Sequence, residues 1–329
     1  MFGDASIEII QKCFHRCLHC SSCSTEQSEA MLPLQVVVHL IAGLHALGID
    51  KICLSGGEPL LHPDVDKIVQ EITKRHIRAD IYSCGIVAQN GVFTAIPVEM
   101  LQSLKRAGLK TMIFNLPSIQ EENYNLITQS SGHLPLALES IYRTVDCDIS
   151  AEIHFVPMKL NLCEAPRIVK FAQKAGVRQV NFLKLMPHGR ALENADQILP
   201  SDEEIVALQR QFYRLGEDGA SIRIGLPLME GEHAPPCHAV KEKLYIRFDG
   251  CVLGCEAFKY VTFRDNKNAE ILPDSIWERD IQDIYHDSAY LRHSLNLISA
   301  YEGMQSGCEN CPVQKYIKNR RFLDELHNS

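Results

Sequence analysis

The chain has 329 residues, of which 46% are hydrophobic and 22% are charged, and its formal net charge is −8. The length has room for one barrel-sized domain and a small appendage, and the acidic balance argues against a broad nucleic-acid-binding surface. Because no apolar run reaches the roughly 18 residues of a membrane span and the first residues lack the features of a signal peptide, we expect a cytoplasmic protein without nucleic-acid or membrane partners.

Strand-like and helix-like patterns alternate from the N-terminus to about residue 186. The predicted strands lie at 6–11, 51–55, 78–83, 110–115, 150–157 and 179–185, and the predicted helices lie at 34–47, 65–74, 98–107, 136–144 and 165–175. Gly48, Gly108 and Gly176 stand where helices end before the next strand. Six β/α repeats in order predict an α/β fold in which a parallel sheet curves into a partial TIM-like barrel.

Three cysteines follow the first predicted strand directly. Cys13, Cys17 and Cys20 have the spacing C-x3-C-x2-C, and 13 cysteines in a chain without a secretion signal indicate metal or redox chemistry rather than disulfides. Soft thiolates at this spacing select an iron–sulfur cluster or zinc. Three ligands hold a 4Fe–4S cube and leave one iron open, whereas a closed zinc site would take a fourth ligand such as His15 or His19.

The second predicted strand ends at the sequence Gly56-Gly57-Glu58-Pro59. Paired glycines let a backbone approach a ligand closely, and the Glu58 carboxylate can accept a hydrogen bond from an ammonium group. The third and fourth strands end at polar residues, Ser83 and Asn115. Since barrels place their active sites at the carboxyl ends of their strands, these residues and the cysteine loop are expected to meet at one face.

Beyond the repeats, a boundary is predicted near 187–200. The run Ser201-Asp202-Glu203-Glu204 is typical of a helix start with a capping box, and a hairpin is predicted at 244–252 with its turn at Asp249-Gly250. We therefore expect a barrel domain at 1–200, a connecting helix and strand at 201–236, and a small C-terminal α+β domain at 237–329.

The C-terminal part carries a second set of cysteines, Cys237, Cys255, Cys308 and Cys311. Cys237 and Cys255 flank the predicted hairpin, with Gly250 between them in the pattern C-x12-G-x4-C. Four thiolates from two distant segments can bind structural zinc or a complete 4Fe–4S cluster. Spacing alone favours neither metal.

The C-x3-C-x2-C loop after the first strand, together with GGEP after the second, resembles the radical S-adenosylmethionine (SAM) superfamily. The C-x12-G-x4-C element is similar to the opening of the SPASM extension of these enzymes, here in the shortened form called twitch, with one auxiliary cluster. The resemblance implies two 4Fe–4S clusters, one that binds SAM and one auxiliary. It assigns the first to Cys13, Cys17 and Cys20 and the second to the C-terminal cysteines.

The resemblance also implies the chemistry. SAM would chelate the open iron, and an electron from an external reductant of the flavodoxin or ferredoxin type would cleave it to methionine and a 5′-deoxyadenosyl radical that abstracts hydrogen. The glycines and Glu58 would hold the methionyl amine, Ser83 and Asn115 are expected to meet the ribose, and Leu18 stands where the family usually has an aromatic against adenine. The cofactor-binding residues implied are therefore Gly56, Gly57, Glu58, Pro59, Ser83, Asn115 and Leu18.

Two outcomes are open for the substrate radical. A fully ligated auxiliary cluster would accept its electron, which favours dehydrogenation or oxidative cross-linking. Epimerisation would need a thiol, and Cys251, beside the hairpin turn, is the candidate catalytic donor, although a bystander role competes with this interpretation. After the sixth strand, Arg190 or His188 would touch the SAM carboxylate or act as a base, or would lie in an ordinary solvated loop.

Three functions remain open from the sequence. We favour a maturase that modifies a peptide, and since 12 residues precede Cys13, a separate leader-peptide recognition protein is expected as a partner. The second is a small-molecule dehydrogenase or cofactor-pathway oxidoreductase acting on an aminocyclitol, sugar or tetrapyrrole. The third is a non-catalytic protein with zinc in both cysteine sets.

Overall fold

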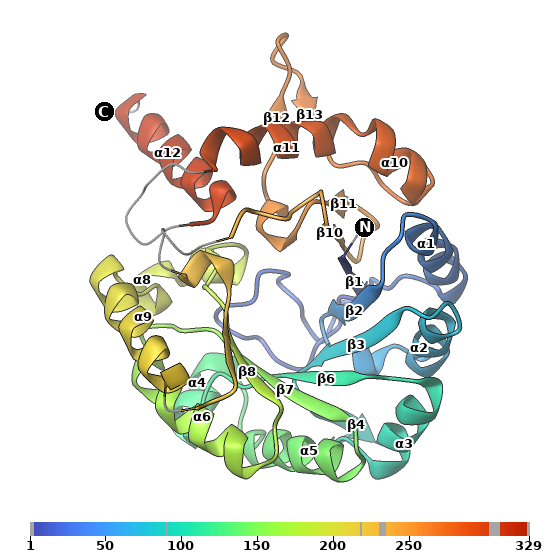
Figure 1. Ribbon diagram of the computed structural model, residues 1–329, viewed down its shortest axis with the longest axis vertical. Helices are drawn as coiled ribbons and strands as arrows, with labels where there is room; N and C mark the ends of the chain where they lie inside the picture. Colours follow the sequence, from blue (N-terminus) through green and yellow to red (C-terminus); the bar gives the residue numbers. More distant parts are fainter. Residues whose placement is uncertain (1–2, 90, 218, 230–234, 303–309, 328–329) are drawn as a thin grey trace.

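The computed structural model describes residues 3–89, 91–217, 219–229, 235–302 and 310–327, and one curved sheet dominates it (Figure 1). Its strands are β1 (Asp4–Ile10), β2 (Lys51–Gly56), β3 (Arg78–Ser83), β6 (Thr111–Asn115), β7 (Ser150–Phe155), β8 (Gln179–Phe182), β9 (Ile222–Ile224), β10 (Lys243–Ile246) and β11 (Val252–Leu253). The strand order is β11-β10-β1-β2-β3-β6-β7-β8-β9. The six strands from β1 to β8 that the repeats predicted run parallel in chain order, which confirms the partial barrel.

Helices cover the convex side of the sheet, and in Figure 1 they form an arc around it. They are α1 (Leu34–Ala46), α2 (Val65–Thr73), α3 (Val98–Ala107), α4 (Glu121–Thr128), α5 (Leu134–Asp146), α6 (Ala165–Lys174) and α9 (Asp202–Glu217). In α2 the buried residues Val65, Ile68, Val69 and Ile72 recur at the spacing that lines one face of a helix. The capping box predicted for α9 is confirmed, since Ser201 N donates to Glu204 Oε2 at 2.7 Å and Glu204 N donates to Ser201 Oγ at 3.2 Å.

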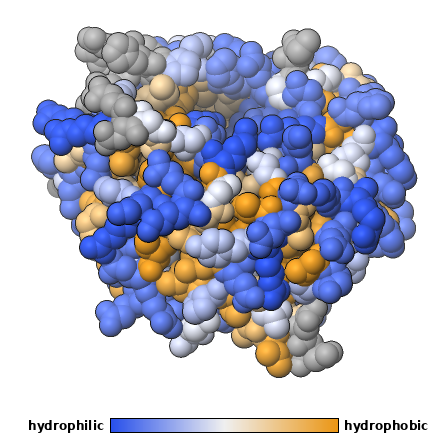
Figure 2. Space-filling view, turned by 60° about the horizontal axis from the view of Figure 1, so that its bottom comes forward, coloured by the Kyte–Doolittle hydropathy of each residue, from blue (hydrophilic) through white to orange (hydrophobic). Residues whose placement is uncertain are grey.

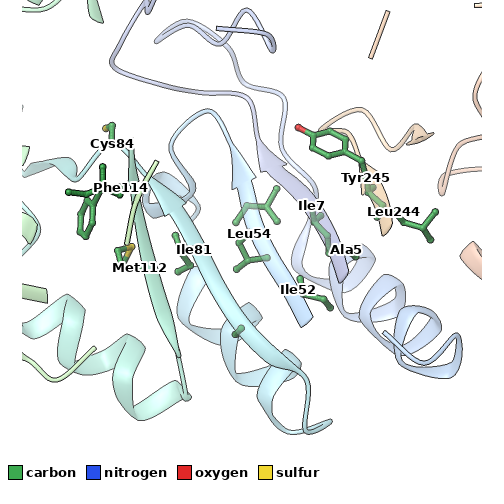
Figure 3. Close-up of a cluster of buried hydrophobic side chains, with 14 of the residues drawn as sticks. Ala5, Ile7, Ile52, Leu54, Ile81, Cys84, Met112, Phe114, Leu244 and Tyr245 are labelled. Carbon is green, nitrogen blue, oxygen red and sulfur yellow. The ribbon is translucent and has the colours of Figure 1, made fainter. Parts of the chain in front are cut away.

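The alternation of side chains gives the sheet one apolar and one polar face. On the helix side, Ile7, Leu54, Ile81 and Phe114 lie in one buried cluster, part of which Figure 3 shows. The residues that alternate with the apolar ones along each strand point to the concave side. They are largely polar: Ser6, Glu8, Cys53, Asp80, Tyr82, Glu152, His154 and Asn181. A barrel interior lined in this way suits a polar ligand better than an apolar core.

The C-terminal hairpin joins the barrel sheet. β10 pairs with β1 in parallel, in the register Asp4↔Lys243, and pairs with β11 in antiparallel, so the predicted hairpin is confirmed. Three helices follow, α10 (Ile281–Asp287), α11 (Ala289–Tyr301) and α12 (Pro312–His327), and they lie across the side of the ring that the earlier helices leave open (Figure 1). The domain boundaries at 201 and 237 stay predictions.

Several short elements were not predicted from the sequence. They are β4 (Ile86–Gln89), β5 (Val92–Ala95), β12 (Phe263–Arg264), β13 (Glu270–Ile271), α7 (Arg190–Glu193) and α8 (Ala195–Ile198). Segments of two to four residues are too short to show a periodicity.

On the face in Figure 2, hydrophobic residues lie among hydrophilic ones. In the described parts of the chain, no helix combines the length and the apolar character needed to cross a bilayer.

Candidate functional site

The cysteine loop begins where β1 ends, at the carboxyl edge of the sheet. Its backbone returns on itself, because Cys13 N donates to Thr25 O at 3.0 Å, and it is tied to α4, because Leu18 N donates to Ile127 O at 2.8 Å. Barrels place reacting groups at this edge. The structure therefore confirms the predicted position of the loop.

The segment after β8 holds the same loop from a second side. Arg190 Nε donates to Cys17 O at 2.9 Å, and its Nη1 donates to Ser24 O at 3.0 Å. Gly189 has a φ of +53°, and a Cβ there would lie 2.7 Å from Cys23 Sγ, so only glycine fits at this close approach. The described contacts of Arg190 thus go to the loop backbone, and its predicted contact with a SAM carboxylate stays a prediction.

The three thiols lie close enough to influence one another's ionisation. Burial, followed by the charges of Cys17 and other neighbours, raises the pKa of Cys13 well above its usual range. Burial and then Cys20 raise the pKa of Cys17 to about 12. Buried thiols ionise when a metal centre balances their charge, so this donor set fits an iron–sulfur cluster.

A single metal ion, such as zinc, would need several of these side chains to point at one common position. Within the described ranges, no three His, Cys, Asp or Glu side chains come close enough together to surround a single ion. The ligands of a cube bind three different iron atoms, whereas zinc ligands share one ion and lie near one another. The assignment of Cys13, Cys17 and Cys20 as cluster ligands stays a prediction.

Gly56 and Gly57 allow the end of β2 to pack directly on the cysteine loop. A Cβ on Gly56 would lie 2.1 Å from Ile10 O, and a Cβ on Gly57 would lie 2.1 Å from Lys12 O. Two short backbone bonds follow, from Gly57 N to Ile10 O at 2.6 Å and from Glu58 N to Lys12 O at 2.8 Å. The close approach predicted toward a ligand is made here to the chain's own backbone.

The Glu58 carboxylate is completely buried and already has partners. Ser83 Oγ donates to Glu58 Oε1 at 2.8 Å, and Cys84 N donates to Glu58 Oε2 at 2.7 Å. Burial raises the pKa of Glu58, while the hydrogen bonds from Cys84 and Ser83 oppose that shift. These bonds join the ends of β2 and β3, and Pro59 begins the short turn that follows. They compete with the contacts to the SAM amine and ribose predicted for Glu58 and Ser83, which stay predictions.

Leu18 and His19, which are adjacent in the loop, lie in different surroundings. Leu18 packs in a small buried cluster with Ile127, Met158 and Leu185, so its side chain is occupied in a core. His19 instead lies beside Asn115 and Arg190, and burial lowers its pKa to about 4, so its ring is neutral near pH 7. The predicted contact of Leu18 with adenine stays a prediction, and His19 joins the candidate site residues through its position beside Asn115.

Buried polar atoms without a partner gather around the cysteine loop. Among the described residues they include His15 Nδ1, His19 Nδ1, Ser24 Oγ, Asn115 Oδ1 and Arg190 Nη2. Buried polar groups are nearly always hydrogen-bonded, and an exception calls for an explanation such as a ligand. The residues present therefore fit a polar cofactor beside the loop. Asn115 ends β6, and its predicted contact with the ribose stays a prediction.

Two residues of the concave face, both missed in the sequence, extend this site into the barrel. The Tyr82 and His154 rings lie 5.2 Å apart between their centroids. Tyr82 directly precedes Ser83 at the carboxyl end of β3, and burial, followed by the charges of Cys17 and Cys20, raises its pKa. Their positions on the inward face of β3 and β7 were the available signal.

The C-terminal cysteines come from distant segments of the chain. Burial raises the pKa of Cys255 well above its usual range, and the charges of Glu256, Cys311 and Cys237 raise it further, so the two other thiols act electrostatically on Cys255. Cys311 precedes α12, and Cys237 N donates to Glu302 Oε1 at 2.8 Å. Cys308 lies outside the described residues. A metal site here stays a prediction for all four.

Cys251 lies directly before β11, and its side chain is half-buried. Arg247 Nη2 donates to Cys251 Sγ at 3.6 Å, and Cys251 N donates to Asp249 Oδ1 at 3.2 Å. Burial and then Asp249 raise the pKa of Cys251, so the thiol keeps its proton near pH 7. His188, in contrast, contacts the backbone, since its Nε2 lies 2.9 Å from Ala257 O.

A curved parallel sheet with a three-cysteine loop at its carboxyl edge, and with glycines packed on that loop, defines a class of cluster-binding barrels. The family model described as the Radical SAM superfamily matches residues 7–172. The chain belongs to the Radical SAM superfamily.

Curated relatives are about a quarter identical to this chain over the residues that align. A GTP 3′,8-cyclase of Marinobacter nauticus is 27% identical over 220 residues, which span 64% of this chain and 62% of that enzyme. A probable GTP 3′,8-cyclase of Methanocella arvoryzae is 26% identical, over 80% of this chain and 85% of the relative. An AdoMet-dependent heme synthase of Methanosarcina barkeri is 27% identical, over 64% and 58%. The chain thus spans less than two thirds of the length of the first and third of these.

Solved structures share the fold across most of the chain. SuiB of Streptococcus suis, bound to its precursor peptide SuiA, superposes with a TM-score of 0.71 at 14% identity, over 94% of this chain and 69% of SuiB. AnSMEcpe, with bound AdoMet and the peptide Cp18Cys, superposes with a TM-score of 0.65 at 12% identity, over 99% of both chains. At 14% and 12% sequence identity, the likeness shows a shared fold and nothing more.

Proposed function

We propose that this protein binds a 4Fe–4S cluster and SAM at its N-terminal cysteine loop and abstracts hydrogen from a peptide substrate. When bound, the cluster and SAM supply a 5′-deoxyadenosyl radical by one-electron reductive cleavage. The single observation that carries the proposal is the cysteine loop at the carboxyl edge, surrounded by unpartnered buried polar atoms. An external one-electron reductant is required.

The chain's own residues orient the cofactors. Cys13, Cys17 and Cys20 would hold the cluster, and Arg190 fixes the loop that carries them through the carbonyls of Cys17 and Ser24. Asn115 and neutral His19 would receive the polar groups of SAM. The buried Glu58 network keeps the ends of β2 and β3 in register beside them.

A second cluster at the C-terminal cysteines is part of the proposal. The electrostatic effect of Cys311 and Cys237 on Cys255 supports it, and the pattern that resembles a twitch extension supplies the fourth ligand, Cys308. Such a cluster would take up the electron of a substrate radical and make the reaction an oxidation. Zinc at both cysteine sets is the competing outcome.

The substrate class rests on the fold likeness. SuiB and anSMEcpe, both seen with peptides, resemble this chain along most of its length, which supports a peptide and, with it, a separate leader-peptide recognition protein. A second candidate is a small molecule, since the curated relatives are named as a GTP 3′,8-cyclase and a heme synthase. The largely polar concave face is compatible with either.

Metal content and SAM cleavage test the class. Anaerobically reconstituted protein is expected to contain about eight irons per chain, four for each cube, and to release 5′-deoxyadenosine from SAM with dithionite. Zinc in place of iron, with no 5′-deoxyadenosine, would overturn the proposal. If a gene next to this one encodes a short peptide, mass analysis of that peptide after co-expression identifies the reaction. Oxidation removes two hydrogens from the peptide, and epimerisation in heavy water adds deuterium to it.

Replacing Cys251 with serine tests the hydrogen donor. This test applies to the epimerisation outcome, in which the wild type incorporates deuterium from heavy water. A protonated thiol donates a hydrogen atom readily and a hydroxyl does not, so Cys251→Ser is then expected to keep 5′-deoxyadenosine release but to lose the deuterium incorporation. The exposed Cys163 provides the control, and Cys163→Ser should keep both. Unchanged deuterium incorporation in Cys251→Ser would show that another residue returns the hydrogen.

A further inference from the structure

We propose that Lys259 is a positioning residue that clamps the N-terminal cysteine loop onto the segment carrying Cys255. The clamp consists of Glu8 on β1, Ser21 and Ser22 in the loop, and Lys259 in the C-terminal region. Its contacts are independent of any cofactor. Its role in orienting a cluster rests on the function proposed above.

The ammonium group of Lys259 is buried and fully used. Lys259 Nζ lies 2.9 Å from Glu8 Oε1, 3.0 Å from Ser21 Oγ and 2.7 Å from Ser22 Oγ. An ammonium group has three donors, and these three acceptors take all of them. The side chains of Lys259 and Glu8 are only 3% and 1% exposed.

The ring of Tyr245 also lies against the ammonium group of Lys259. Lys259 Nζ lies 4.9 Å from the centroid of the Tyr245 ring, a distance that gives a favourable cation–π contact. Figure 3 shows Tyr245 next to β1. Lys259 is therefore enclosed by β1, by the neighbouring strand β10 and by the cysteine loop.

Burying a charge is costly, and a buried ion pair is often no more stabilising than well-packed apolar side chains. We therefore explain this buried pair by the relative position in which it holds two segments of the chain. Each segment carries cysteines, because Ser21 follows Cys20 directly and Lys259 lies four residues after Cys255. The short turn Glu256–Phe258 occupies the interval between Cys255 and Lys259.

Two further contacts lie on either side of Lys259. Tyr260 Oη donates to Ser21 O at 2.7 Å, and His188 Nε2 lies 2.9 Å from Ala257 O. His188 is adjacent in sequence to the Gly189 and Arg190 that hold the loop from the other side. The orientation of the cysteine loop is thus shared between the segment after β8 and the segment after Cys255.

A variant that releases only the loop separates this role from general stability. Replacing both serines, Ser21→Ala with Ser22→Ala, keeps the Glu8–Lys259 pair. It removes the two contacts of Lys259 to the loop hydroxyls and the hydrogen bond that Ser22 Oγ donates to Glu8. The matched control is Ser28→Ala: Ser28 Oγ donates to Gln11 Oε1 at 2.7 Å and Gln11 Nε2 donates to Ser22 O at 3.2 Å, so this variant loosens the same loop without touching Lys259. Circular dichroism should show that both variants fold.

Amide hydrogen exchange of the full chain, purified anaerobically, is the primary measurement. In the double serine variant we expect exchange to rise at least about tenfold both in residues 20–24 and in residues 256–260, as the loss of three hydrogen bonds predicts. Ser28→Ala should leave 256–260 unchanged. A rise confined to the loop, or one that Ser28→Ala reproduces, would overturn the clamp.

A second variant and a spectroscopic readout complete the test. Lys259→Met should release both segments further; if it fails to fold, the serine variant decides alone. In reconstituted protein, the change that SAM causes in the electron paramagnetic resonance signal of the reduced cluster should be altered in the double serine variant and kept in Ser28→Ala. If wild-type protein cleaves no SAM, the proposed function fails while the exchange result still decides the clamp.

Discussion

Replacing Cys17 with alanine is expected to abolish 5′-deoxyadenosine release, to below the detection limit of anaerobic chromatography with mass analysis. Two thiolates from one loop no longer hold a cube, and the carbonyl of Cys17 remains the anchor for Arg190, so the loop should keep its path. Iron content should fall by about four per chain, with the C-terminal site still loaded.

The exposed Cys163 supplies the control for that experiment, because it lies outside both cysteine sets. Cys163→Ser should retain the iron and the activity of the wild type. If Cys17→Ala still released 5′-deoxyadenosine at a comparable rate, the SAM-binding cluster could not sit at this loop.

Adding one methyl group at Gly57 is expected to be equally damaging. A Cβ there would lie 2.1 Å from Lys12 O and 2.5 Å from Gln11 O, both backbone atoms that cannot rotate away. The end of β2 must then separate from the cysteine loop. We expect Gly57→Ala to lower the free energy of unfolding by about 3 kcal/mol, measured by urea denaturation, and to eliminate cluster binding.

Gly216 provides a matched glycine in a permissive position. It lies in α9, and the nearest atom to an added Cβ would be Ile222 Cδ1 at 3.9 Å. Since alanine is a better helix former than glycine, Gly216→Ala should be neutral or stabilising by up to about 1 kcal/mol. Equal stability of Gly57→Ala and the wild type would contradict the close packing of β2 on the loop.

Most of the barrel was predictable because its signals are local. Apolar residues recur at the spacing of a strand in β3 and of a helix in α3, and both predicted ranges match the bounds in the structure. Gly108 ends α3 with a positive φ of 98°. The helices after Ile281 were missed, since the C-terminal region was interpreted only through its cysteines and hairpin. The hairpin itself was predicted, but its pairing with β1 was not, because sheet neighbours far apart in sequence leave no periodic signal.

The candidate site was predicted in its residues more than in their contacts. Sequence placed Glu58 and Ser83 at a ligand, whereas the structure joins them to each other at 2.8 Å. It gave His19 only as a possible zinc ligand, whereas the structure places His19 beside Asn115 and packs Leu18 in a small core with Ile127. The direction of a loop side chain depends on what the loop packs against, and that information lies elsewhere in the chain.

By itself, the sequence determined the order of the strands along the barrel, the two cysteine spacings and the family, since covalent spacing and short-range periodicity carry these features. Only the tertiary structure decided that Glu8 and Lys259, 251 positions apart, share one buried ion pair against the cysteine loop. The physical reason is that burial of charge becomes tolerable only where folding brings its partners together, and no local pattern records which partners those are.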